Sequence, residues 1–392
     1  MSDPVVIVSA VRTPMGGMLG DFASLSASDL GAVAVKAAVE RAGLKPEQIE
    51  EVILGNCLIA AQGQAPARQA TLKAGLPKGV GAVTLTKMCG SGMKATQLAH
   101  DEIMAGTREI VVAGGMESMT NAPHMLPKAR SGYRYGAAQL LDHMATDGLE
   151  DAYDRKAMGV HAENCVTKYA FTREAQDAFA IASTERAKAA TASGAFKWEI
   201  VPVTVKGRGG DVSIEVDEQP PKAKLDKIPG LKPAFVKDGT ITAANASSIS
   251  DGAAALVVMK LSKAKALGLT PLAKIVGHAE HSQEPEWFTT APVGAIKNLF
   301  KKTGWTTKDV DLYEVNEAFA AVTMAAMKEF DIPHDKVNIH GGACALGHPI
   351  GASGARIIVT LIGALRKTGG KKGVAALCIG GGEGIAIAIE ML

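Results

Sequence analysis

Short apolar runs that are typical of strands alternate with longer helical segments over most of this chain of 392 residues. In the first part, one helix is predicted from Ser28, its N-cap, to near Gly43, and a second over residues 90–105, with Gly43 and Gly106 as the stops. Strands are predicted over residues 5–9, 51–54, 83–87 and 110–113. This β-α-β-α order predicts an α/β protein with a mainly parallel sheet covered by helices.

The last part of the chain repeats this order of elements and some of the local amino-acid sequence. Residues 43–53 resemble residues 304–314, and residues 111–115 match residues 377–381. A helix is predicted to end at Gly304, and strands are predicted over 312–315, 374–379 and 385–390. One further helix is predicted to begin with residues 316–319, and another to span 351–368. We interpret the repeat as an ancient duplication that produced two similar α/β halves, with chance similarity of two helix–strand units as the alternative.

The repeat suggests a division into three parts. We expect an N-terminal half over residues 1–120, completed by about 249–270, and a C-terminal half over 271–392. Between them, residues 121–248 are rich in irregular, Pro- and Gly-interrupted sequence with one long helix near 172–192. Long ordered insertions usually serve binding or assembly, so this segment is predicted to be an inserted loop domain.

Composition excludes several classes of protein. The formal net charge of +2 indicates no nucleic-acid partner, and the longest apolar stretches are too short to cross a bilayer. The N-terminus has no signal peptide pattern, so a cytoplasmic location is expected. The five cysteines form no C-x-x-C pair, which indicates free thiols and no metal site.

Cys89 is the first candidate catalytic residue. It lies between a predicted strand and a predicted helix and is followed by Gly90, Ser91 and Gly92, which suits a sharp turn that exposes a nucleophile. Because backbone N–H groups and the helix dipole favour a negative charge there, we expect the thiol pKa to be lowered. A buried, inert cysteine is the alternative.

Three further polar residues occupy comparable places. His348 precedes Pro349 among small residues and could serve as the base that activates a thiol, or as a structural histidine. Cys378 ends a buried strand before Gly380 and its neighbours, and could exchange a proton with a substrate carbon or remain a core cysteine. Asn316 could hold a water or a carbonyl oxygen, or could only cap the following helix.

Taken in order, these motifs resemble the thiolases over the whole chain, and most closely the short-chain biosynthetic type. The resemblance rests on residues 9–14 (SAVRTP), 89–92 (CGSG), 114–119 (GGMESM), 245–247 (NAS), 316–319 (NEAF), 347–349 (GHP) and 378–382 (CIGGG). It implies the thiolase fold, a five-layered αβαβα core made of two duplicated α/β halves with an inserted loop domain. It also implies a homotetramer, a dimer of dimers, in which the stretch 121–136 provides the tetramerisation loop.

The resemblance implies an acetyl-CoA C-acetyltransferase with a ping-pong mechanism. Cys89, activated by His348, would take an acetyl group from acetyl-CoA, and Cys378 would deprotonate a second acetyl-CoA. The carbanion would attack the acyl-cysteine to give acetoacetyl-CoA and CoA, and thiolysis is the reverse. Asn316 with a water, together with His348, would bind one thioester oxygen, and the backbone N–H groups of Cys89 and Gly380 the other. CoA thioesters are substrates here, and no cofactor or metal is implied.

The family's substrate channel is also carried over onto this chain, with some departures. The implied CoA-binding residues are Leu149, Met158, Ser247, Ala318 and Phe319, with Phe288 at the acyl pocket in place of a frequent Met. The departures are Ala157 for a His, Pro221 for an Arg, Ser248 for a Gly, Glu383 for an apolar residue and Cys344 for an aliphatic one, with Lys222, Lys224 and Lys227 near the place of the missing Arg. These lysines could contact the CoA phosphates or form a solvated loop.

Three other functions remain as alternatives. The first is a broader-specificity 3-ketoacyl-CoA thiolase that acts on longer chains. The second is a carrier-protein-dependent ketosynthase of the same superfamily, against which Cys378 argues because that group generally lacks the second cysteine. The third is a non-catalytic acyl-CoA binder or redox sensor that uses Cys89 only as a reactive thiol.

Overall fold

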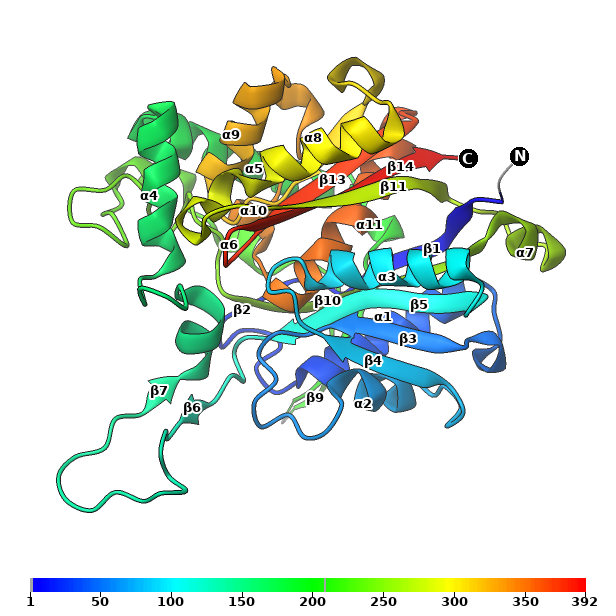
Figure 1. Cartoon of the computed structure of the whole chain (residues 1–392), viewed down its shortest axis with the longest axis horizontal. Coiled ribbons are helices and arrows are strands. Elements are labelled where there is room, and N and C mark those ends of the chain that lie inside the picture. The colour runs from blue at the N-terminus through cyan, green and yellow to red at the C-terminus, as the bar shows by residue number, and fades with distance from the viewer. Residues whose placement is uncertain (1–2, 208) are drawn as a thin grey trace.

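The computed structural model describes residues 3–207 and 209–392 and has five layers (Figure 1). Two sheets lie one above the other, and two helices, α3 and α11, fill the space between them. Helices α1 and α2 cover the outer face of one sheet, and α8 and α9 cover the outer face of the other. This layering is the expected αβαβα arrangement.

The N-terminal half contributes the lower sheet of Figure 1, in the strand order β4-β3-β5-β10-β1, with the short β2 paired to β10. Its strands are β1 (Val5–Arg12), β2 (Gly16–Gly17), β3 (Glu51–Gly55), β4 (Gly81–Leu85), β5 (Ile110–Ser118) and β10 (Ser250–Lys260). Its helices are α1 (Ala27–Arg41), α2 (Pro66–Lys73), α3 (Ser91–Ala105) and α7 (Leu261–Ala266).

The C-terminal half contributes the upper sheet, in the order β12-β13-β14-β11. Its strands are β11 (Ala273–Ser282), β12 (Leu312–Val315), β13 (Lys372–Ile379) and β14 (Glu383–Met391). Its helices are α8 (Ala291–Thr303), α9 (Ala320–Phe330), α10 (Ala343–Leu346) and α11 (Ile350–Thr368). The order matches β3-β5-β10-β1 strand for strand, as a duplication requires, and β1 and β11 pair briefly to join the two sheets.

The prediction of a mainly parallel sheet is wrong. Only β3–β4, β3–β5 and β12–β13 pair in parallel among the described strands, and the remaining pairs of the large sheet are antiparallel. The reason is local in the C-terminal half, where β13 and β14 are joined by the short turn at Gly380–Gly382, and a turn this tight can join only antiparallel strands. In the N-terminal half, β10 returns from the long insertion and lies antiparallel between β1 and β5.

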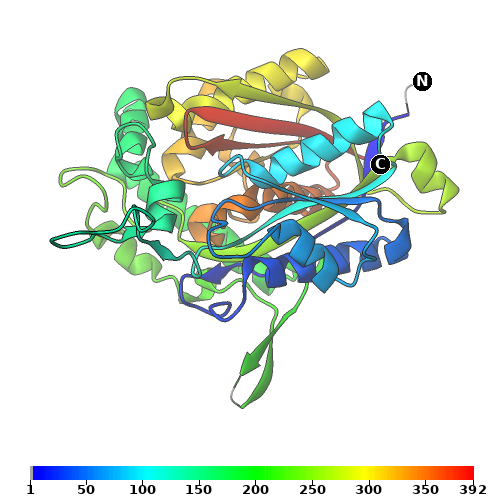
Figure 2. The same cartoon turned by 60° about the horizontal axis from the view of Figure 1, so that its bottom comes forward.

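The segment from 121 to 248 lies partly at the left side of the two sheets in Figure 1 and partly beneath the lower sheet, where Val203 and Ile214 pack with the core under that sheet. Among the residues that the structure describes, its strands pair with each other: β6 (His124–Met125) with β7 (Leu141–Asp142), and β8 (Val203–Gly207) with β9 (Gly210–Ile214). Its helices are α4 (Met158–Tyr169), the long α5 (Arg173–Ala192) and α6 (Gln219–Lys222), with a single π-helical turn at Ala145–Leu149. The β6–β7 arm and the β8–β9 hairpin both project from the body (Figures 1 and 2). Division of the chain at 120, 248 and 271 stays a prediction.

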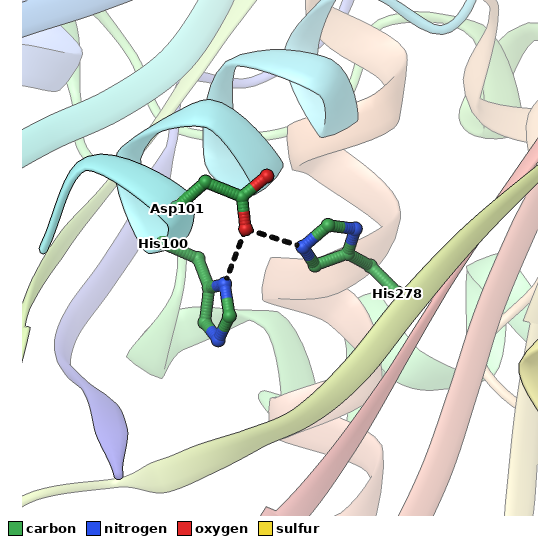
Figure 3. A group of neighbouring side chains, drawn as sticks. All are labelled: His100, Asp101 and His278. Carbon is green, nitrogen blue, oxygen red and sulfur yellow. Dashed lines mark hydrogen bonds and ion pairs between the residues drawn. The ribbon is translucent and has the colours of Figure 1, made fainter. Parts of the chain in front are cut away.

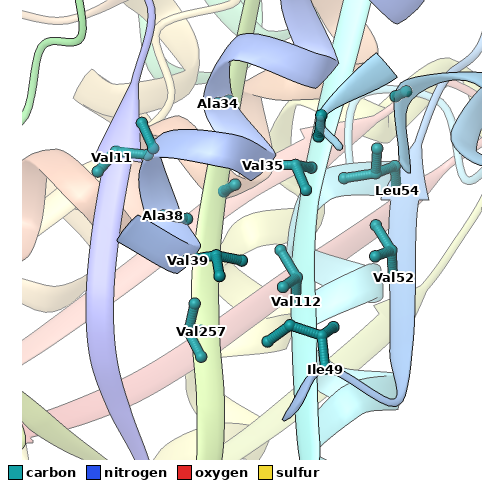
Figure 4. Close-up of a cluster of buried hydrophobic side chains, with 14 of the residues drawn as sticks. Val11, Ala34, Val35, Ala38, Val39, Ile49, Val52, Leu54, Val112 and Val257 are labelled. Atoms are coloured by element: carbon teal, nitrogen blue, oxygen red, sulfur yellow. The ribbon is translucent and has the colours of Figure 1, made fainter. Parts of the chain in front are cut away.

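Small and β-branched side chains bring α1 close to the lower sheet (Figure 4). Ala34 and Ala38 let the helix approach, while Val35 and Val39 fill the space above Val112 and its neighbours on the strands. All of these side chains are buried, and full burial of a valine stabilises the fold by roughly 1.5–3 kcal/mol. Similar packing of α3 and α11 between the sheets holds the ends of these helices in place, and the site described below lies at those ends.

The helix boundaries follow the capping residues, with one correction. The first helix is capped by Ser26 rather than by Ser28, because Ser26 and Asp29 form a reciprocal capping box. Gly106 and Gly304 end α3 and α8 in the left-handed conformation, as predicted. None of the helices among the described residues is long and apolar enough to cross a membrane.

Candidate active site

The four predicted catalytic residues lie at one edge of the two sheets, three of them in loops and one near the end of a strand. Cys89 lies between β4 and α3, His348 lies just before α11, and Asn316 directly follows β12. Cys378 is near the end of β13, two residues before the Gly380 turn. The chain positions that the sequence analysis selected are thus all carried on strand ends and helix starts, although they are up to 289 residues apart.

Two glycines allow the starts of α3 and α11 to meet. A Cβ atom added at Gly92 would lie 2.7 Å from the backbone nitrogen of Ala355, and one at Gly354 would overlap the backbone of Met93. No side chain fits in either place, so glycine is needed for this close approach. The approach places the segments that carry Cys89 and His348 next to each other.

The turn that carries Cys89 has a strained backbone and is stabilised by two hydrogen bonds of Ser91. Met88 has a φ of +43°, a conformation that costs a non-glycine residue about 1–3 kcal/mol. The Ser91 hydroxyl donates to the Met88 carbonyl over 2.7 Å and accepts a bond from the Lys87 N–H over 2.7 Å. These two bonds hold the turn in the shape that presents the Cys89 thiol, which is partly accessible.

The pKa of Cys89 differs from the expectation. Burial raises the pKa of this thiol to about 11, although the N–H groups of Gly380 and of Cys89 itself favour the thiolate. The expected lowering by the helix start is therefore wrong for the free protein, because desolvation of the thiolate outweighs the backbone N–H groups. The same two N–H groups are those predicted to form an oxyanion hole, and both are directed at this sulfur.

His348 is neutral and its tautomer is determined by Ser353. Burial, together with the nearby cation of Arg356, lowers the pKa of His348 to about 3. The Ser353 hydroxyl donates to the Pro349 carbonyl over 3.0 Å, so it can only accept from Nδ1 of His348, which is 2.6 Å away. A proton on Nδ1 leaves the lone pair on Nε2, which is the form that a general base needs.

Asn316 contacts His348 rather than capping a helix. Its Nδ2 lies 3.5 Å from the imidazole nitrogens, and α9 begins only at Ala320, with Phe319 in the N-cap position. The cap alternative is therefore wrong. On its other side, Oδ1 of Asn316 accepts from Nη2 of Arg356 over 3.4 Å, so the buried guanidinium orients the amide.

Cys378 is completely buried behind Cys89. Burial raises the pKa of the Cys378 thiol well above its ordinary value, and the charge of a Cys89 thiolate raises it further. This interaction means that the two sulfurs are close enough for ionisation of one to oppose ionisation of the other. Both thiols are therefore protonated in the free protein.

Cys89, His348 and Gly380 lie on the wall of a cavity of about 460 Å³. Its volume is suited to a small molecule or to the arm of a larger one. The wall also includes every residue that was expected to bind CoA: Leu149, Met158, Ser247, Phe288, Ala318 and Phe319. Cys378 and Asn316 are not part of this wall; they lie behind it.

Several residues of the site were missed by the sequence analysis. Ser353 is five residues after His348, in the first turn of α11 and in the same glycine-rich segment, so a hydroxyl at that spacing was a usable signal. Arg356 and the cavity residue Phe235 had no local signal, because their contacts come from elements that are distant in the chain. Glu117 was quoted only as part of a motif, yet its buried carboxylate accepts from the N–H groups of Cys57 and Gly351.

The residues that depart from the family pattern have identifiable neighbours. Ala157 lines the cavity, and the buried Phe288 packs edge-on against Phe319. Glu383 forms an ion pair with Lys87. A second hollow of about 380 Å³ is lined by Lys222, Lys224 and Lys227, and Pro221 belongs to the short helix α6 beside it. Ala243 and Ser248 line both this hollow and the main cavity, and Cys344 lines the second hollow.

Comparison with known proteins agrees with this geometry. Residues 5–262 match the family model "Thiolase, N-terminal domain" and residues 269–391 match "Thiolase, C-terminal domain". Among curated proteins, the chain is 54% identical to the acetyl-CoA acetyltransferase of Cupriavidus necator, covering 98% of this chain and 99% of that one. It is 51% identical to acetyl-CoA acetyltransferase 2 of Arabidopsis thaliana, covering 99% and 97%.

Solved structures give the same result. The Acat5 thiolase of Ascaris suum in complex with coenzyme A superposes with a TM-score of 0.95 at 46% identity, over 99% of this chain and 100% of that one. The acetyl-CoA acetyltransferase of Bacillus anthracis superposes with a TM-score of 0.97 at 43% identity, over 100% and 99%. With both family models matched and the fold shared over its full length, this chain belongs to the thiolase family.

Proposed function

We propose that the chain is an acetyl-CoA C-acetyltransferase, which condenses two acetyl-CoA into acetoacetyl-CoA and CoA and catalyses the reverse thiolysis. The observation that carries the proposal is the meeting of Cys89, His348 and Gly380 on one apolar cavity, with Cys378 and Asn316 directly behind them. Relatives named acetyl-CoA acetyltransferase match the chain over almost its whole length.

The first half-reaction transfers the acetyl group to Cys89. Nε2 of His348 takes the thiol proton as the sulfur attacks the thioester carbonyl, and the C–S bond to CoA breaks. The CoA thiolate then takes the proton from the imidazolium. Because both the thiol and the imidazole are neutral in the free protein, the ion pair forms only when the thioester is bound.

The second half-reaction forms the carbon–carbon bond. With Cys89 acetylated, no thiolate charge opposes ionisation of Cys378. The Cys378 thiol gives its proton to Nε2 of His348, and the resulting thiolate removes a proton from the methyl group of a second acetyl-CoA. The carbanion attacks the acetyl carbonyl, and the Cys89 thiolate leaves and takes up the proton held by His348, while Cys378 keeps the proton from the methyl group. We assign one oxyanion site to the backbone N–H groups of Cys89 and Gly380 and the other to His348 with Asn316.

We propose that CoA binds along the same cavity. Leu149, Met158, Ser247, Ala318 and Phe319 would surround the pantetheine arm, with Phe288 nearest the acyl group. The second hollow shares Ala243 and Ser248 with the main cavity, and we propose that its lysines meet the CoA phosphates. This chemistry uses thiols, an imidazole and backbone N–H groups, so we propose that the reaction needs no resident cofactor.

We further propose that the protein is a homotetramer in the cytoplasm. The tetramer proposal is supported by the β6–β7 arm, which projects from the body and exposes Leu126. Multi-angle light scattering of the purified chain would test it, and an arm deletion that yields dimers would support the assigned contact. A monomer at micromolar concentration would contradict it.

Thiolysis assays test the proposed function. Purified protein is given free CoA with acetoacetyl-CoA or with a longer 3-ketoacyl-CoA, and we expect preference for the four-carbon substrate. Preference for the longer one would instead support the broader-specificity thiolase, and turnover of neither would overturn the assignment. Cys378→Ala separates an enzyme from a binder or sensor, because only an enzyme loses condensation while Cys89 still accepts an acetyl group.

A further inference from the structure

Three potential metal ligands converge outside the active site, where α3 packs against β11 (Figure 3). His100 and Asp101 are consecutive on α3, and His278 reaches them from β11. We call these residues the His-Asp-His triad. It joins the N-terminal half to the C-terminal half and has no part in the proposed reaction, because the helix places His100 about 14 Å beyond the start of α3.

The triad is already close to the geometry of a coordination shell. Nδ1 of His100 and Nε2 of His278 each lie 2.9 Å from the same carboxylate atom, Oδ1 of Asp101. All three potential ligand atoms lie within 4.8 Å of one another. Ligands about 2.0–2.2 Å from a zinc ion are themselves roughly 3 Å apart, so the two histidine–aspartate distances need almost no change.

The accessibility of the triad also suits a metal ion. The Asp101 side chain is 53% exposed, so an ion can reach the site and water can complete its coordination.

A second group with three potential ligands is a weaker candidate. Asp151 and Asp154 lie near His161, but Asp151 already accepts from the backbone N–H groups of Tyr153 and Asp154. Asp154 is also paired with Lys156. These carboxylates organise a loop, whereas the carboxylate of Asp101 is bonded to the two imidazoles.

We propose that the His-Asp-His triad binds a divalent transition-metal ion of the zinc class, with water in the remaining position. Two nitrogen ligands and one carboxylate favour Zn²⁺, Co²⁺ or Ni²⁺ over the oxygen-seeking Mg²⁺ and Ca²⁺. The bound ion ties α3 to β11 and stabilises the folded protein without acting on the substrate. This proposal departs from the sequence-based expectation that the chain has no metal site.

One nearby charge opposes the ion. Lys302 donates to the backbone carbonyl of His278 over 3.2 Å, so its ammonium group lies beside the triad. Because like charges repel, Lys302→Gln is expected to bind the metal more tightly than the unmodified protein. A triad that bound no metal would not respond to this change.

Co²⁺ is the probe for the test because its absorption spectrum reports its ligands. The full-length protein is titrated with Co²⁺ by calorimetry and absorption spectroscopy, next to His278→Gln and the control His281→Gln on the same strand. We expect one Co²⁺ ion per chain, with an absorption spectrum typical of nitrogen and oxygen ligands. Its affinity should fall about tenfold or more in His278→Gln and stay unchanged in His281→Gln. The ion should raise Tm in the unmodified protein and in the control.

The test separates this site from the active-site thiols. A thiolate-to-cobalt charge-transfer band that disappears when Cys89 is alkylated would place the ion at the catalytic cysteines and overturn the proposal. Equal binding by His278→Gln and His281→Gln, or no stoichiometric binding, would do the same. Thiolysis of acetoacetyl-CoA by His278→Gln checks that the variant is folded, and its rate should be unchanged.

Discussion

The guanidinium of Arg356 lies 3.4 Å from Oδ1 of Asn316, and both side chains are buried. The bond is a long one, but the charge of Arg356 determines which end of the amide faces it. With Oδ1 turned toward the cation, Nδ2 faces His348 on the opposite side. Arg356 therefore acts as a positioning residue for the oxyanion site that we assign to Asn316.

Replacement of Arg356 tests this role. Arg356→Gln is expected to lower kcat for thiolysis by about tenfold or more, because a misplaced donor loses much of its effect, while the KM for CoA changes little. Arg356→Lys keeps the charge and should recover part of the rate. Arg356 also pairs with the buried Glu314 over 3.5 Å, and because removal of one partner of a buried ion pair is destabilising, Tm is measured for both variants. Equal kcat for the two variants at equal Tm would refute the positioning role.

Ser353→Ala is expected to reduce activity far more than stability. The hydroxyl holds Nδ1 of His348 in its protonated form, and without it the unproductive tautomer becomes populated. We expect kcat to fall about tenfold or more, with a loss of only about 1 kcal/mol in unfolding free energy. Thr96→Val is the matched control, because Thr96 also bonds to a carbonyl four residues earlier in a buried helix but touches no imidazole. An equal rate loss in both variants would argue against tautomer control.

Alkylation of Cys89 should follow its raised pKa. Only the thiolate reacts, and a thiol with a pKa of about 11 is protonated at neutral pH. The rate of inactivation by iodoacetamide should therefore rise about tenfold per pH unit between pH 6 and 9. A plateau that begins below pH 7 would instead reveal a thiolate–imidazolium pair in the free protein. Substrate protection identifies the alkylated thiol as that of the active site.

The ion pair between Lys87 and Glu383 links the two loops that carry Cys89 and Gly380. Nζ of Lys87 lies 2.8 Å from Oε1 of Glu383 and 3.2 Å from Oε2 of Glu280. Because the pair is partly exposed, its loss in Glu383→Gln should weaken the link between the two loops by about 0.2–1 kcal/mol. If all of this energy is lost from the transition state, kcat/KM for thiolysis falls by no more than about fivefold. High salt should cause a similar loss in the unmodified protein. Glu40→Gln, which removes an exposed pair with Lys36, is the control and should leave the rate unchanged. Insensitivity of the unmodified enzyme to salt would contradict the link.

Phe288 is expected to limit the length of the acyl chain. Its ring is buried, packs against Phe319 and lines the cavity. Phe288→Met substitutes a slimmer, flexible side chain of similar polarity and should raise the kcat/KM ratio of a longer 3-ketoacyl-CoA to acetoacetyl-CoA. If the ratio stays the same, another part of the cavity sets the specificity.

The sequence by itself determined the local structure and the chemical groups. Strand and helix positions followed from apolar patterns and from stops such as Gly106 and Gly304, which depend on interactions within a few residues. Cys89, His348 and Cys378 were recognisable because each stands in a glycine-rich turn, and such a turn is itself a local signal. Assignment of the family followed from the order of these turns along the chain.

Tertiary structure decided everything that depends on distant neighbours. The antiparallel place of β10 was not visible in the chain order, because it depends on where the insertion returns. The pKa of Cys89 was misjudged because burial, which outweighs the helix start, is a property of the whole fold. The partnership of Arg356 with Asn316, and that of His278 with Asp101, join elements far apart in sequence, so only the packed layers could bring them together.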